Sequence, residues 1–68
     1  MAGFTLDTVL DDIQADYNAS CNKEESISRL RNIYRSDLIR LNKTMSGKDF
    51  WGSIDALGLR NAVEKIMK

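Results

Sequence analysis

The chain has 68 residues, of which 43% are hydrophobic and 29% are charged, and its ten basic and ten acidic side chains give a formal net charge of zero. This composition is typical of a folded domain and lies outside the regime of low hydrophobicity and high net charge that keeps chains disordered. We therefore expect a single all-α domain over residues 1–68, located in the cytoplasm, without a signal peptide or a membrane-spanning segment.

The first helix is predicted over residues 5–18. Apolar side chains recur there every three or four residues, which places them on one face of a helix: Leu6, Val9, Leu10, Ile13 and Tyr17. Thr5 is expected to cap the helix, and Phe4 to pack on Val9. The helix should end in residues 18–22, because Asn and Ser side chains there favour turns and caps.

A second helix is predicted over residues 23–43. Asn22 and Glu25 have the spacing of a capping box at its start. Its apolar stripe consists of Ile27, Leu30, Tyr34, Leu38 and Leu41. Ile33 and Ile39 lie off this stripe on opposite flanks, so they are surplus to the expected core.

The third helix is predicted over residues 47–57, with Ser46 as its cap. Phe50, Ile54 and Leu57 form its apolar stripe, and Trp51 lies at the edge of the stripe. Trp51 therefore either covers the core or anchors an interface.

The remaining residues, 59–67, are predicted to form a short fourth helix after a break at Gly58. In one continuous helix, the apolar residues after Gly58 would lie roughly 150° from the stripe before it. A left-handed Gly58 ends the third helix instead and brings Leu59 onto Ile54. The alternative is an unbroken helix with two apolar faces, the second of which is covered by a partner.

Residues 50–67 resemble the helix-turn-helix of bacterial and phage regulators. They combine an apolar helix, a turn glycine followed by an aliphatic residue, and a second helix that carries Arg60, Asn61, Lys65 and Lys68. The resemblance implies a DNA-binding transcriptional regulator in which these four side chains contact nucleic acid. The register departs from the family, because Glu64 stands where the first buried residue of the second helix is expected and Val63 precedes it. A net charge of zero also gives no general attraction to phosphates, so a glycine that merely ends a helix is the preferred interpretation.

The charges are separated along the chain although they balance in total. Residues 1–20 contain four aspartates and no basic residue, whereas residues 21–48 contain seven basic residues and three acidic ones. In the simpler interpretation, the first two helices pack antiparallel, and Arg31 and Arg35 pair with the acidic helix for about 0 to 1 kcal/mol per pair. In the functional interpretation, one charged surface docks a partner of opposite sign.

The sequence offers little catalytic chemistry. It contains no histidine, so the usual general base and the commonest metal ligand are both missing, and Cys21 has no activating neighbour of that kind. The aspartates lack the spacing and the glycine of a calcium loop. We therefore expect no catalytic residue, no metal site, no cofactor and no enzymatic activity.

The leading hypothesis is a small noncatalytic module that binds or occludes a partner protein, and the alternative is the DNA-binding regulator that uses residues 50–67. The side chains assigned to the partner surface are Trp51, Ile33, Ile39, Arg29, Arg40, Asp12 and Asp16. We favour a homodimer over a monomer, because the surplus apolar residues need a cover. An origin as a phage or plasmid accessory protein fits the size and composition, although no family resemblance supports it.

Overall fold

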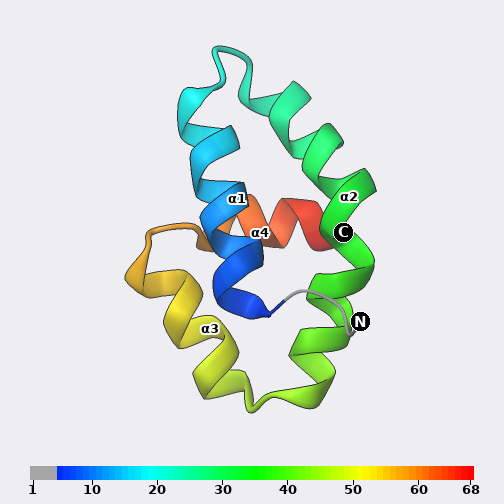
Figure 1. The fold of residues 1–68 in the computed structure, drawn as a ribbon, viewed down its shortest axis with the longest axis vertical. Helices are drawn as coiled ribbons and strands as arrows, with labels where there is room; N and C mark the ends of the chain where they lie inside the picture. The colour runs from blue at the N-terminus through cyan, green and yellow to red at the C-terminus, as the bar shows by residue number, and fades with distance from the viewer. Residues whose placement is uncertain (1–4) are drawn as a thin grey trace.

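The computed structural model describes residues 5–68, which form four α-helices (Figure 1): α1 (Leu6–Ala19), α2 (Lys23–Thr44), α3 (Gly47–Ala56) and α4 (Arg60–Met67). This arrangement confirms the predicted all-α bundle of three helices and a short fourth one. The expected contact of Phe4 with Val9 lies outside the described residues.

Side chains cap α1, α2 and α3 at their N-termini, as the sequence predicts. In each case the side-chain oxygen accepts a hydrogen bond from the backbone N–H three residues later: Thr5 from Thr8 (3.3 Å), Asn22 from Glu25 (3.2 Å) and Ser46 from Asp49 (3.1 Å). Each cap satisfies an N–H group that has no partner within its helix, and so fixes where the helix begins.

Gly58 separates α3 from α4. Its φ of 70° lies in the left-handed region that glycine adopts at little cost. The N–H of Gly58 donates to the carbonyl of Asp55, and the N–H of Leu59 donates to the carbonyl of Ile54, both at 3.0 Å. These two bonds form a Schellman cap, so the alternative of one unbroken helix is wrong.

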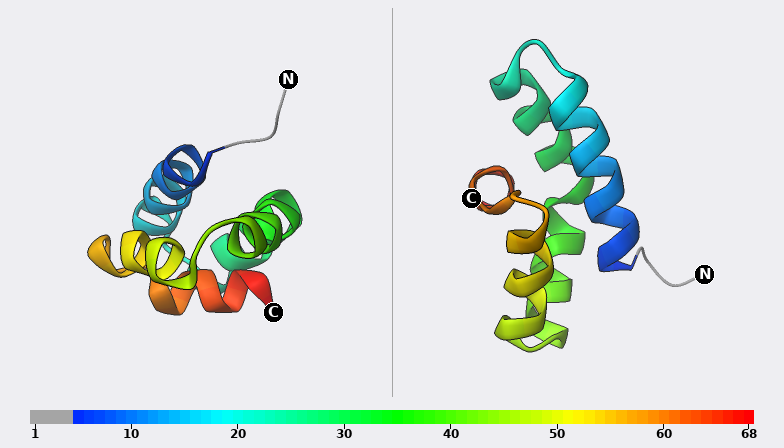
Figure 2. Two further views of the ribbon diagram at one scale, coloured as in Figure 1. Left: turned by 90° about the horizontal axis from the view of Figure 1, so that it is seen from below. Right: turned by 90° about the vertical axis from the view of Figure 1, so that its left-hand side faces the viewer.

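The four helices form two hairpins and a crossing element. α1 and α2 run antiparallel, and α3 returns alongside the second half of α2 (Figure 1). α4 runs across the other helices, and Figure 2 shows it end-on in the right-hand view, where the other three run up the page. Its most extensive contact is with α2. The turn at Gly58 therefore lays α4 over one side of the core.

All four helices contribute to one apolar core. Its buried members are Leu6, Val9, Leu10, Ile13, Ile27, Leu30, Tyr34, Leu38, Leu41, Phe50, Ile54, Leu59, Ala62, Val63 and Ile66. The predicted stripes account for these residues, and the apolar face of α4 is covered within the chain. Two predicted stripe members are outside this buried set. Tyr17 is only partly buried against the core, and Leu57 is 40% exposed because α3 ends at Ala56. Within residues 5–68, no helix is both long enough and apolar enough to cross a lipid bilayer.

Candidate functional site

Two of the side chains assigned to the partner surface, Asp16 and Arg29, bind each other. The Nε of Arg29 donates to Oδ2 of Asp16 at 3.0 Å, and its Nη2 donates to Oδ1 at 2.5 Å. The hydroxyl of Ser26 adds a third bond to the same carboxylate at 3.3 Å. The hydrogen bonds from Arg29 lower the pKa of Asp16. This cluster joins α1 to α2 across the edge of the core.

Asp12 and Arg40 also have partners within the chain. The buried hydroxyl of Tyr34 donates to the Asp12 carboxylate, and this bond, together with burial, raises the pKa of Tyr34 to about 12. Arg40 lies 3.6 Å from Asp37, one turn away on α2. Together with the pair of Asp16 and Arg29, these contacts occupy four of the seven assigned side chains.

The three apolar members of the assigned surface differ in exposure. Ile33 is 53% exposed, whereas Ile39 and Trp51 are half-buried. The ring of Trp51 packs edge-on against Phe50, with centroids 5.0 Å apart, and the guanidinium of Arg60 lies 4.6 Å from the Trp51 ring centroid. Trp51 therefore covers the core and is itself covered by a cation.

The four side chains suggested for nucleic-acid contact are exposed; three lie on α4, and Lys68 is its C-cap. Arg60 makes a two-pronged ion pair with Asp55, through Nε at 2.7 Å and Nη2 at 2.8 Å, and lies 3.8 Å from Glu64. This pairing lowers the pKa of Asp55. Arg60 is thus engaged within the chain, whereas Lys65 and Lys68 form no ion pair among the described residues.

The simpler interpretation of the sequence pairs Arg31 and Arg35 with the acidic helix, but the structure does not show this pairing. Instead, Nη2 of Arg31 donates to the main-chain oxygen of Lys65 at 2.8 Å, and Nε of Arg35 donates to that of Lys68 at 3.0 Å. The last main-chain oxygens of a helix lack donors within it, and the fold places those of Lys65, in the last turn of α4, and Lys68, its C-cap, against α2 where the arginines lie. Both arginines therefore hold the C-terminal end of α4 on α2.

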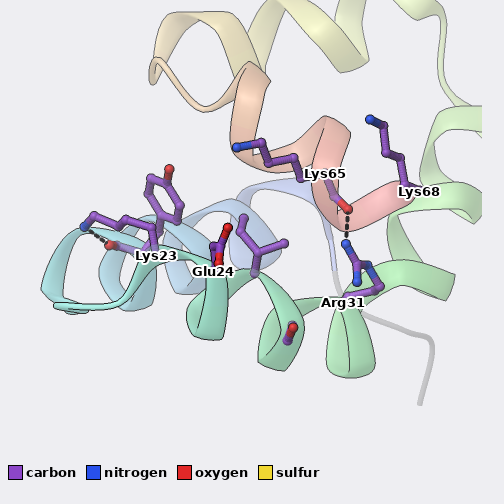
Figure 3. A pocket seen from close by; sticks show the side chains of 8 residues that line it. Lys23, Glu24, Arg31, Lys65 and Lys68 are labelled. Carbon is purple, nitrogen blue, oxygen red and sulfur yellow. Dashed lines mark hydrogen bonds between the residues drawn. The ribbon is translucent and has the colours of Figure 1, made fainter.

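A basic groove results where α4 meets the first half of α2 (Figure 3). It encloses about 370 Å³ and is lined by Tyr17, Lys23, Glu24, Ile27, Ser28, Arg31, Lys65 and Lys68. Four of these residues are basic and one is acidic. The ammonium of Lys23 lies 4.8 Å from the ring centroid of Tyr17 and donates to the Tyr17 carbonyl. The basic groove therefore joins cations from two helices.

A second groove, between α1 and α3, has the opposite charge. It is lined by Asp7, Leu10, Asp11, Ser53, Ala56 and Leu57. Two carboxylates and the exposed part of Leu57 give this acidic groove a negative and partly apolar surface. The two grooves have no lining residue in common.

The described residues contain little that binds metals or reacts covalently. Within residues 5–68, no group of three or more His, Cys, Asp or Glu side chains is placed to hold a metal ion, and Cys21 is exposed and free of a disulfide. Comparison with models of protein families, with curated proteins and with solved structures gives no match.

Proposed function

We propose that the protein is a small noncatalytic module that acts by binding another protein. The observation that carries this proposal is the separation of charge: the basic groove between α2 and α4 has four cations and one acid, and the acidic groove between α1 and α3 has two carboxylates. Complementary charge steers a partner toward a surface and selects against partners of the wrong sign. Two oppositely charged surfaces that share no lining residue suit a protein that occludes or bridges its partners.

DNA binding by α3 and α4 is the second candidate. It is favoured by the position of Lys65 and Lys68 in the basic groove beside Arg31. Three features oppose it: Arg60 is paired with Asp55, Glu64 lies on the exposed face of α4, and the net charge of the chain is zero. Because nonspecific DNA affinity depends on neutralising phosphates, these features favour the protein-binding function.

The test is affinity capture from a nuclease-treated lysate of the organism that encodes the chain. Wild-type protein is compared with a basic-groove variant, Lys65→Glu with Lys68→Glu, and with an acidic-groove variant, Asp7→Lys with Asp11→Lys. A control, Lys43→Glu with Lys48→Glu, makes the same charge change as the first variant at residues that line neither groove.

The proposed function predicts at least one protein that wild type and the control enrich and that one groove variant loses. The opposite result would be no variant-sensitive protein, together with retardation of mixed-sequence DNA by wild type at low salt and its loss in the basic-groove variant. That result would replace protein binding with DNA binding as the function.

A further inference from the structure

We propose that the basic groove binds an acidic segment of a partner protein, in the form of an extended peptide with spaced carboxylates. This inference rests on the proposed function and names the class of partner. The groove gathers Lys23 and Arg31 from α2 with Lys65 and Lys68 from α4 (Figure 3). Residues more than thirty positions apart in the sequence therefore present positive charge to one ligand.

No ion pair among residues 5–68 engages the cations of the basic groove, which are Lys23, Arg31, Lys65 and Lys68. Glu24 is the one acidic residue in the lining. The Nε of Arg31 is buried and has no hydrogen-bond acceptor among the described residues. Carboxylates are the natural partners of both ammonium and guanidinium groups, so an acidic ligand fits this set.

Two of the four cations are held in place before a ligand arrives. Arg31 is fixed by its bond to the Lys65 main-chain oxygen, and Lys23 is held by the ring and the carbonyl of Tyr17. Fixed side chains lose less conformational entropy when a ligand binds. Lys65 and Lys68 have exposed side chains that can adjust to the ligand. The basic groove thus combines a fixed wall with two adaptable cations.

The acids around the groove favour a peptide over a nucleic acid. Glu24 lies in the lining, and Glu64 precedes Lys65 on the exposed side of α4. A nucleic-acid backbone carries negative charge at every phosphate, so it would place phosphates near these carboxylates. A peptide places carboxylates only where acidic residues occur, and Ile27 and Tyr17 can contact its apolar side chains.

The experiment is an NMR titration of the full ¹⁵N-labelled chain with a short peptide of Glu, Gly and Ser, at low and at moderate salt. The same peptide with Gln in place of Glu is the uncharged control ligand. We expect shift changes confined to Tyr17, residues 23–31 and residues 65–68, and weaker binding at higher salt. The basic-groove variant, Lys65→Glu with Lys68→Glu, should weaken binding by about tenfold or more, because two attractions become repulsions. The control, Lys43→Glu with Lys48→Glu, should change it by less than about twofold.

Three results would overturn the inference: equal binding of the Gln peptide, shift changes outside the basic groove, or stronger binding of a mixed-sequence DNA duplex at the same residues. The spectrum of each variant also reports whether it is folded, and Lys65→Gln with Lys68→Gln provides a milder second variant. The proposed function survives a failure here if lysate capture yields a protein that the Asp7→Lys, Asp11→Lys variant loses. If the titration fails and capture also yields no protein that either groove variant loses, both proposals fail.

Discussion

At the scale of single residues, polar contacts fix how α1 packs against α2. Tyr34 is predicted from its place on the apolar stripe to be buried, and the structure places it in the core. Its acceptor, Asp12, is not predicted from the sequence, nor is the pairing of Asp16 with Arg29. The stripe determines which face of a helix is buried. How α1 crosses α2 determines which acidic side chain meets which donor. The spacing of apolar residues in the sequence does not determine that crossing.

Replacing Tyr34 by Phe removes the hydrogen bond to Asp12 and should lower the free energy of unfolding by about 1 kcal/mol at neutral pH. The bond raises the pKa of Tyr34 from 10.0 to about 12, so the folded state favours the protonated hydroxyl. The stabilisation is therefore fully present below pH 10 and is lost as the pH rises through 12. Across that window, wild type should lose roughly 2 kcal/mol relative to Tyr34→Phe.

Urea unfolding of both proteins between neutral pH and pH 12 provides the measurement. All other ionisable groups are common to the two chains, so the difference between the curves isolates Tyr34. Parallel curves across the alkaline range would mean that the hydroxyl does not donate to Asp12 in the folded protein.

At the scale of secondary-structure elements, the turn at Gly58 is predicted from sequence and its consequence for α2 is not. The change in phase of the apolar residues indicates that the third helix must break, and Gly58 is the residue that can adopt the left-handed conformation. How α4 then crosses α2 depends on packing throughout the core. That crossing redirects Arg31 and Arg35 from the acidic helix to the carbonyls of Lys65 and Lys68, and so creates the basic groove.

Two glycine substitutions test the turn. Gly58 has a φ of 70°, and a Cβ at this position would meet no atom within 4 Å, so the cost of Gly58→Ala is conformational. The free energy of unfolding should fall by about 1 kcal/mol. Gly52 lies within α3, and a Cβ there also meets nothing within 4 Å, so Gly52→Ala should stabilise the protein by roughly 0.5–1 kcal/mol.

Thermal melts of the two variants provide the measurement, because the same replacement of glycine by alanine should have opposite effects at the two positions. The melting temperature should fall for Gly58→Ala and rise for Gly52→Ala, each by on the order of 5 °C in a domain of this size. A rise for Gly58→Ala would show that α3 continues into α4 in solution.

At the scale of the whole molecule, the sequence predicts the separation of charge but not the surfaces that result. Arg29, Asp12 and Asp16 are assigned from the sequence to the surface that binds another protein. In the structure, Arg29 pairs with Asp16, and Asp12 accepts a hydrogen bond from Tyr34. Lys23 and Arg31 become groove residues because α4 folds back onto α2. The two walls of that groove are distant in the sequence, so no local motif identifies it.

We predict a monomer in solution. The apolar residues after Gly58, for which the sequence suggests a covering partner, are buried by the chain itself. Among the described residues, the most exposed large apolar side chains are Ile33 and Leu57. A stable dimer interface buries roughly 800 Å² on each partner, more than two such side chains supply. Sedimentation equilibrium at micromolar concentration should give a mass of 7.7 kDa. A mass of two chains that returns to one on replacing Ile33 by Asp would instead support the homodimer expected from the sequence.

Hydrogen exchange of the full chain, alone and with the protein recovered by lysate capture, tests directly whether the basic groove binds an acidic partner. We expect slower amide exchange in residues 23–31 and 65–68 when the partner is bound. We expect no such change when the Lys65→Glu, Lys68→Glu variant is mixed with the same partner. Slower exchange confined to residues 7–11 and 53–57, at the acidic groove, would contradict binding at the basic groove.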